Sequence, residues 1–126
     1  MARISLVTLL VHDYDEAISF YVGKVGFRVL EDVAQPAGKR WIVVGPDDTV
    51  GVLLAQADTP EQRSSVGAQT GGRVGFFLTT DDFAGDHARM SEAGVRFLEQ
   101  PRHEPYGTVA VFEDLYGTKW DLIQPA

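Results

Sequence analysis

The stretch Gly-Phe-Arg-Val-Leu-Glu at residues 26–31 returns in related form as Gly-Val-Arg-Phe-Leu-Glu at residues 94–99, about 68 residues further along the chain. In each copy a glycine follows a helical pattern and precedes a strand-like run, so both copies mark a corner between a helix and a strand. An aspartate suited to capping a helix recurs at the same offset, as Asp13 and Asp81. We interpret this repetition as an internal duplication; the alternative is coincidence between two helix-to-strand corners.

The first half predicts the order strand, helix and three strands. Residues 4–11 form an apolar, β-branched run, and the helix that follows has Asp13 as its N-cap, Glu16 three positions on and Gly26 at its end. The apolar side chains of this helix fall on one stripe: Tyr14, Ala17, Ile18, Tyr21, Val22 and Val25. Three strand-like runs then cover residues 27–32, 40–44 and 50–57, separated by turn sequences at residues 35–38 and 45–48.

The same order of elements returns in the second half. Residues 58–72 are polar, rich in turn formers and without apolar periodicity, so we expect a connector there. The elements expected beyond it are a strand at 73–79, a helix capped by Asp81 or Asp82, and strands at 95–99, 108–113 and 119–124. The stripe of this second helix comprises Phe83, His87, Met90 and Gly94. The chain is thus one domain over residues 1–126, with a first module at about 1–57, a linker at about 58–72 and a second module at about 73–126.

Two such modules define the fold class. We predict an α+β protein in which two βαβββ modules form curved mixed sheets around a cavity, because one helix covers only one face of each sheet. Alternate residues of the strands would line this cavity, where a small ligand can bind. Strand alternation sends the neighbours Phe76 and Phe77 to opposite faces, so at most one of them lines the cavity.

Composition excludes several classes of function. The 126 residues include 11 lysines and arginines against 18 aspartates and glutamates, a formal charge of -7 that disfavours nucleic acid and anionic membrane surfaces as partners. The absence of cysteine removes disulfides, thiolate metal sites and cysteine nucleophiles, and fits a cytoplasmic location. The apolar run at residues 6–11 is far shorter than the roughly 20 residues that span a bilayer, and no signal-peptide pattern precedes it. We therefore expect the chain to be the whole mature protein.

Three motifs then suggest a family. They are Leu-x-Val-x-Asp-x-x-x-Ala-x-x-Phe-Tyr at residues 9–21, Gly-Phe-Arg-Val at residues 26–29, and Phe-x-Asp-x-x-Gly-x-x-Trp-Asp-Leu at residues 112–122. Their order and spacing resemble those of the vicinal oxygen chelate superfamily, also called the glyoxalase, bleomycin-resistance and extradiol-dioxygenase superfamily. The resemblance covers nearly the whole chain and implies paired βαβββ modules, frequent assembly as a homodimer and, in the enzymes, a divalent metal held by four side chains that substrate oxygens chelate.

The four metal-binding positions that this resemblance implies are mostly apolar here. The first falls on Leu6, the second on Leu53, and the third on Val74, or on Gly75 if the register follows Asp82. Of the four, the last alone has a carboxylate, as Asp121. Since transition metals need about three protein donors, we expect neither the usual metal site nor another cofactor, with a rearranged divalent-metal site as the disfavoured alternative.

Asp121 is the first candidate for ligand binding. Trp120 and Leu122 alternate with it, so Asp121 shares the other face of its strand with Lys119 and Ile123. If this face lines the cavity, its carboxylate can accept hydrogen bonds from a ligand or pair with a cationic group. The alternative is a polar residue on the outer face of the strand.

Three further residues are candidates for the ligand site. His103 lies in a loop beside Tyr106, just before a strand that would line the cavity. Tyr106 and Trp41 each offer a flat ring with one polar tip as a wall for a ligand, although Trp41 also suits the core. The remaining histidines, His12 and His87, fit ordinary surface or packing positions.

Three hypotheses of function remain open. The first is a small-molecule-binding protein of the bleomycin-resistance kind, without the usual metal, that sequesters an aromatic or cationic compound. The second is a superfamily enzyme, a lyase, isomerase or dioxygenase, with a rearranged metal site or with acid–base catalysis by Asp121 together with His103 or Tyr106. The third is a regulatory or partner-binding module. We expect a small-molecule ligand and a homodimer, and neither nucleic acid nor membrane as a partner.

Overall fold

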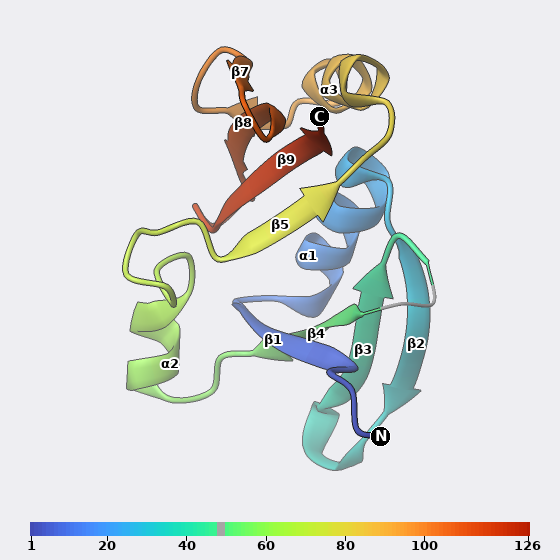
Figure 1. Ribbon diagram of the computed structural model, residues 1–126. Helices are drawn as coiled ribbons and strands as arrows, with labels where there is room; N and C mark the ends of the chain where they lie inside the picture. Colours follow the sequence, from blue (N-terminus) through green and yellow to red (C-terminus); the bar gives the residue numbers. More distant parts are fainter. Residues whose placement is uncertain (48–49) are drawn as a thin grey trace. The chain divides into compact units, whose positions relative to one another are not determined.

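The computed structural model describes residues 1–47 and 50–126, which form two compact units, residues 1–66 and 67–126 (Figure 1). Each unit combines a mixed β-sheet with helices, which confirms the predicted α+β class. The predicted turn at residues 45–48 lies partly outside the described residues. Across the described residues, every helix is too short or too polar to cross a membrane.

Unit 1 contains the predicted strand, helix and three strands, followed by one more helix. Its elements are β1 (Leu6–Val11), α1 (Tyr14–Phe20), the π-helical turn η1 (Tyr21–Val25), β2 (Arg28–Ala34), the 3-10 turn η2 (Pro36–Gly38), β3 (Arg40–Gly45), β4 (Gly51–Gln56) and α2 (Pro60–Ser65). The strand order in the sheet is β1-β4-β3-β2, with β1 and β4 parallel and the other pairs antiparallel. The sheet therefore keeps the first and last strands of the module side by side.

Helix α1 begins at the predicted cap. The Oδ2 atom of Asp13 accepts a hydrogen bond from the Glu16 amide at 2.9 Å, which satisfies one of the free N–H groups of the first turn. The side chains of Tyr14, Ala17 and Phe20 are buried. Tyr14 and Ala17 belong to the apolar stripe predicted from the sequence. At its far end the chain turns into β2 through Gly26.

Unit 2 contains six elements. They are β5 (Phe76–Thr79), α3 (Phe83–Glu92), β6 (Arg96–Phe97), β7 (Arg102–Glu104), β8 (Gly107–Glu113) and β9 (Lys119–Pro125). The strand order is β5-β9-β8-β6, and β7 also pairs with β8; β5 and β9 are parallel, while the other pairs are antiparallel. Strand β5 begins three residues later than predicted, β6 covers only two residues of the predicted run at 95–99, and β7 was not predicted.

Strand β6 is short for a local reason. The Leu98 amide still bonds to the Val111 carbonyl, but the Val111 amide bonds to Oε2 of Glu99 at 2.9 Å instead of to the backbone. The glutamate side chain therefore replaces the next rung of the ladder, and the chain leaves β8 before returning as β7. The apolar run in the sequence does not reveal that the Glu99 side chain takes the place of a backbone acceptor here.

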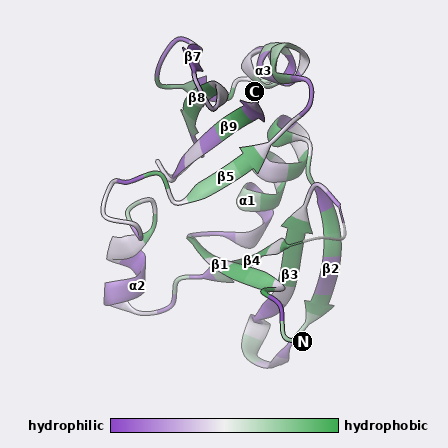
Figure 2. Ribbon diagram, in the orientation of Figure 1, coloured by the Kyte–Doolittle hydropathy of each residue, from purple (hydrophilic) through white to green (hydrophobic). Residues whose placement is uncertain are grey.

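The predicted connector is also corrected, because part of it is helix α2. Thr59 caps this helix by accepting a hydrogen bond from the Gln62 amide at 3.1 Å, and Pro60 occupies the first turn, where the missing N–H has no cost. None of the residues of α2 is buried, so the helix has no apolar periodicity for a pattern to detect. Figure 2 shows its largely hydrophilic colouring.

The two copies of the repeated corner have the same backbone geometry. Gly26 and Gly94 both have a φ of 97°, and the residue after each donates its amide to a carbonyl of the preceding helix: Phe27 to Tyr21 and Val95 to Met90, each at 2.9 Å. Such left-handed glycines end helices because they lack a Cβ. The helix-to-strand corners are therefore structurally equivalent.

The second helix cap is Asp82 rather than Asp81. The Gly85 amide donates to Oδ1 of Asp82 at 3.1 Å. The interval from cap to glycine is consequently one residue longer in the first copy, where the turn η1 is π-helical and holds an extra residue. Counting from Asp82 moves the third metal-binding position from Val74 to Gly75.

Alternation along β9 places Trp120 and Leu122 in the core of unit 2. Trp120 and Leu122 are buried, and the Trp120 ring stacks on Phe76 and Phe112 at centroid distances of 4.7 and 5.9 Å. Phe76 is 9% exposed and Phe77 66%, which confirms their predicted orientation to opposite faces. The other face of the sheet carries Phe77 and Asp121.

Candidate functional site

Asp121 lies on the sheet face of unit 2 opposite the buried tryptophan. Its cross-strand neighbours are Phe77 on β5 and Val111 on β8, because paired residues in adjacent strands point to one face. Lys119 and Ile123 share this face from β9 itself, as the sequence predicted. We call this surface the Asp121 face, defined by the residues Phe77, Val109, Val111, Lys119, Asp121 and Ile123.

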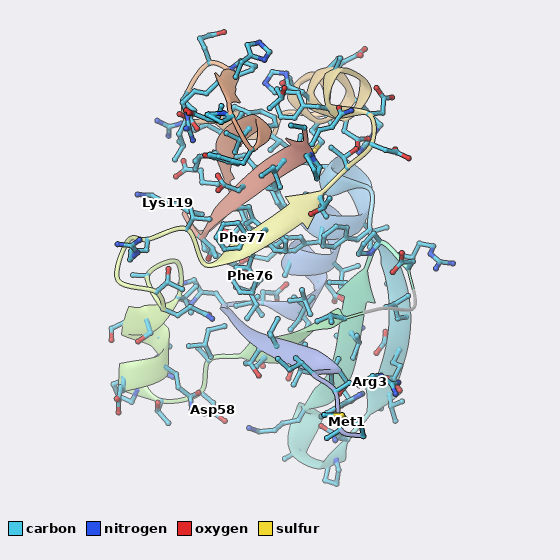
Figure 3. All side chains as sticks on the ribbon, in the orientation of Figure 1. Met1, Arg3, Asp58, Phe76, Phe77 and Lys119 are labelled. Carbon is cyan, nitrogen blue, oxygen red and sulfur yellow. The ribbon has the colours of Figure 1, made fainter. Side chains whose placement is uncertain are left out.

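A pocket of about 290 Å³ opens on the Asp121 face. The residues that line it are Gly72, Val74, Leu98, Glu99, Val111 and Lys119. Two of these residues flank Asp121 on the sheet: Val111 lies directly across from it, and Lys119 comes two residues before it on β9. Phe77, the neighbour of Asp121 on β5, is exposed, while the adjacent Phe76 is buried; both are labelled in Figure 3. The lining of the pocket therefore combines apolar side chains with the charged groups of Glu99 and Lys119.

The carboxylate of Asp121 is only partly satisfied. Its Oδ1 atom is buried, and within the described part of the chain no hydrogen-bond donor reaches it. Burial raises the pKa of Asp121 above its usual value; the positive charge of Arg102 opposes this change, and the negative charge of Glu99 adds to it. A donor or cation supplied by a ligand would remove the cost of burying this oxygen.

Arg102 lies near Asp121 but bonds to two glutamates. Its Nε donates to Oε1 of Glu99 at 2.7 Å, and its Nη1 donates to Oε1 of Glu104 at 2.8 Å. The hydrogen bond from Arg102 lowers the pKa of Glu99, an effect that burial opposes and the Val111 amide reinforces. The hydrogen bonds from Arg102 to the two glutamates raise its pKa, with the bond to Glu99 having the larger effect. The guanidinium is thus held in a three-residue network beside the pocket.

The predicted residues of the second module are only partly brought together. Tyr106 lies in the turn between β7 and β8, is 56% exposed, and its side chain interacts with Arg102. His103 pairs with Thr108, and its Nδ1 lies 3.3 Å from Thr108 Oγ1, on the sheet face opposite Asp121. The structure therefore brings Tyr106 to Arg102, and it places His103 on the sheet face opposite Asp121.

Trp41 belongs to unit 1, on strand β3. It is half-buried, and its Nε1 donates to Oε2 of Glu31 at 3.3 Å. Glu31 and Leu6 contribute to a separate pocket of about 320 Å³, together with Arg3, Ser5, Leu30, Val43 and Gly51. Figure 3 labels Arg3 near the start of the chain. A role for Trp41 in ligand binding stays a prediction.

Sequence reasoning missed two residues of the site, Glu99 and Arg102. The signal that could have found Arg102 is the alternation in Arg-His-Glu at residues 102–104, which places its first and third side chains on one face. Prolines on both sides of this short segment made a loop the natural interpretation. The role of Glu99 depends on its bond to the Val111 amide and has no local sequence signal.

The residues at the implied metal positions do not fit a metal. Leu6 and Leu53 have no donor atoms, and Gly75 has no side chain at all. A Cβ placed on Gly75 would lie 2.5 Å from Cγ2 of Thr70, so Thr70 fills the space that a metal-binding side chain would need. In residues 1–47 and 50–126, no three histidine, aspartate or glutamate side chains are grouped to hold a metal ion. Among the residues that the structure describes, Asp121 is therefore not part of a cluster suited to a metal.

The fold and these sequence motifs define a class of protein. The chain belongs to the Glyoxalase/Bleomycin resistance protein/Dioxygenase superfamily, whose family model matches residues 3–122. This membership confirms the resemblance drawn from the motifs around Asp13, Gly26 and Asp121.

Individual relatives and solved structures are also similar to this chain. The chain is 54% identical over 121 residues to an uncharacterized protein of Shewanella frigidimarina (strain NCIMB 400), covering 94% of this chain and 90% of that protein. It is similar to the crystal structure of UcmS2, with 33% identity, 98% of each chain covered and a TM-score of 0.84. It is also similar to TnmS3, an antibiotic binding protein from Streptomyces sp. CB03234, with 32% identity, 100% of this chain and 98% of that chain covered, and a TM-score of 0.83.

Proposed function

We propose that the protein binds an aromatic or cationic small molecule in the pocket on the Asp121 face, without the metal that superfamily enzymes use. The observation that carries this proposal is the buried Oδ1 of Asp121, which lacks a hydrogen-bond donor within the described residues and belongs to a residue whose cross-strand neighbour, Val111, lines the pocket. The similarity to TnmS3, an antibiotic binding protein, supports a binding function of the same kind.

The charges around the pocket favour a cation. Glu99, Glu104 and Asp121 contribute three carboxylates, against two cations, the guanidinium of Arg102 and the ammonium of Lys119. Because both bonds of Arg102 go to the glutamates, the charge of Asp121 is not neutralised by a contact ion pair. A protonated amine on the ligand would therefore gain a charge-assisted hydrogen bond at a partly dry site.

The apolar part of the pocket favours an aromatic body. Val111 lines the pocket floor next to Asp121, and the ring of Phe77 is 66% exposed on the same face. A planar ligand that covers both would bury apolar surface while its amine reaches the carboxylate. Tyr106, which interacts with Arg102, provides a further ring at the same edge of the sheet.

The geometry supports binding more than metal-free acid–base catalysis. Such catalysis needs two groups that reach the same substrate atoms. His103 lies on the opposite sheet face from Asp121, which removes one of the two predicted pairs. The other predicted pair is Asp121 and Tyr106. Tyr106 interacts with Arg102, and burial raises the pKa of Asp121.

Two probes of opposite charge test the proposal. Calorimetry would compare 1-naphthylmethylammonium with 1-naphthylacetate, which share an aromatic body. We expect saturable binding of the ammonium probe, weakened by about tenfold to a hundredfold in Asp121→Asn, which keeps the shape and removes the charge. Asp81→Asn, an exposed aspartate in the same unit, is the matched control and should bind as the wild type does. Equal affinity for both probes, or no saturable binding of either, would contradict the proposal.

A further inference from the structure

We infer that Glu99 and Glu104 form a clamp that keeps Arg102 from pairing with Asp121, so that the pocket selects an organic cation such as a protonated amine. This inference rests on the proposed function, because it explains what keeps the binding carboxylate available. It assigns specificity to residues that adjoin the ligand-binding carboxylate.

The strand register shows where Glu99 and Arg102 lie relative to Asp121. Glu99 bonds to the amide of Val111, the residue across from Asp121. Arg102 lies opposite Val109, which pairs with Ile123, so it is diagonal to Asp121 on the same sheet face. Val109 and Val111 share the Asp121 face of β8. The charges of Arg102 and Glu99 both influence the pKa of the Asp121 carboxyl, Arg102 lowering it and Glu99 raising it.

The other groups that face Asp121 do not neutralise it. Phe77 on β5 and Val111 on β8 are uncharged. Lys119 on β9 donates its Nζ to the carbonyl of Gly72 at 3.0 Å, and its cross-strand neighbour is Glu113, which forms an ion pair with Arg96. Arg102 is therefore the cation that could pair with Asp121 if it were released from Glu99 and Glu104.

The clamp works by competition between acceptors. In the wild type, Arg102 donates to two carboxylates, while Oδ1 of Asp121 remains buried without a donor from the described residues. If both glutamates lose their charge, the strongest nearby acceptor for the guanidinium is Asp121. An arginine tethered beside the carboxylate has a high effective concentration and would displace a free organic cation.

Charge-neutral variants of the same shape test this idea. Glu99→Gln combined with Glu104→Gln keeps an acceptor for the Val111 amide but releases Arg102. We expect the affinity for 1-naphthylmethylammonium to fall at least about tenfold in this double variant. Adding Arg102→Gln should restore affinity to within about threefold of the wild type, because no internal cation then competes.

A matched triple variant separates the clamp from general electrostatics. Lys119→Gln in the same double variant removes one positive charge from the same face, as Arg102→Gln does. If long-range charge alone set the affinity, both triple variants would recover equally, which would overturn the clamp. Recovery by Arg102→Gln alone supports it, and unchanged affinity in the double variant overturns it.

A ligand-free measurement keeps the clamp testable if the proposed function fails. Carbon-detected NMR of the Asp121 carboxyl reports its pKa in each variant, and circular dichroism checks that each is folded. We expect the pKa of Asp121 to fall in the double variant, to return toward the wild-type value with Arg102→Gln, and to stay low with Lys119→Gln. Absence of probe binding with this pattern would reject the function and retain the clamp; the same pKa in all variants would reject the clamp.

Discussion

Burial and ionisation oppose each other at Asp121, and this makes its contribution to stability depend on pH. Because the pKa of Asp121 is raised in the folded state from its ordinary value of 3.8, the folded protein binds this proton more readily than the unfolded chain does. Stability from this group is therefore greatest below pH 3.8 and is lost as the pH rises through the raised folded-state pKa.

Asp121→Asn should consequently stabilise the protein at neutral pH. We expect the free energy of unfolding to rise by about 1 kcal/mol at pH 7, because an ionised oxygen no longer lies buried without a donor. The difference should shrink toward zero near pH 3, where the wild-type carboxyl is protonated in both states. Urea denaturation at the two pH values measures it, with Asp81→Asn as the exposed control. A variant less stable than the wild type at pH 7 would contradict the assignment of an unsatisfied charge.

At the residue scale, the sequence predicts only those features that local spacing determines. Alternation with Trp120 and Leu122 is enough to place Asp121 on the open face of its strand. The separation of His103 from this face and the bond from Glu99 to the Val111 amide depend on where a short strand begins. Such a boundary is decided by tertiary hydrogen bonds rather than by the residues of the segment.

Helix α3 provides a test of capping at the scale of elements. The structure assigns the cap to Asp82, whose Oδ1 accepts the Gly85 amide, while Asp81 is exposed before it. Asp82→Ala should lower the free energy of unfolding by about 1 kcal/mol, the usual cost of losing an N-cap. Asp81→Ala should change it by less than about half of that amount. Equal effects of the two substitutions, measured by chemical denaturation, would rule out this assignment.

The segment before β5 provides a second test. Gly67 has a φ of 82°, and a Cβ added there would collide with the backbone carbonyl of Tyr116. Gly71 has a φ of 67° with open space around it. Gly67→Ala should therefore destabilise the protein by more than about 2 kcal/mol, against about 1 kcal/mol for Gly71→Ala, which has the backbone strain alone.

The comparison of these two variants isolates the steric contact. Both lose the conformational freedom of glycine at positive φ, so the difference between them reports the approach of Tyr116. Thermal unfolding followed by circular dichroism would show it. If both variants melt at the same temperature, the segment does not pack against the Tyr116 carbonyl.

Element order was predictable because caps, glycines and strand periodicity act locally. The departures have physical causes that are not local. Helix α2 buries no side chain and so has no periodic signal, and the π-helical turn η1 inserts one residue that shifts the equivalence from Asp81 to Asp82. The duplicated corners at Gly26 and Gly94 remained recognisable because left-handed geometry restricts the residue type.

For the whole molecule, superfamily membership and the chemistry of individual positions give different information. Membership is indicated by motifs that shape the fold, such as the cap at Asp13 and the glycine at 26. The metal chemistry of the superfamily's enzymes depends on four other positions, where this chain has Leu6, Leu53, Gly75 and Asp121. A shared fold therefore does not transfer the enzymes' chemistry to this chain.

The same positions predict how the whole protein behaves toward metals. Protein purified without chelators should contain less than about one tenth of an equivalent of zinc, nickel, manganese or iron, because one carboxylate is too few donors for a stable site. EDTA, followed by removal of the chelator, should leave both the melting temperature and the affinity for 1-naphthylmethylammonium unchanged. Elemental analysis by mass spectrometry and calorimetry measure the two quantities. A stoichiometric metal whose removal weakens probe binding would show that donors outside these four positions complete a site, and the proposed metal-independent function would then be wrong.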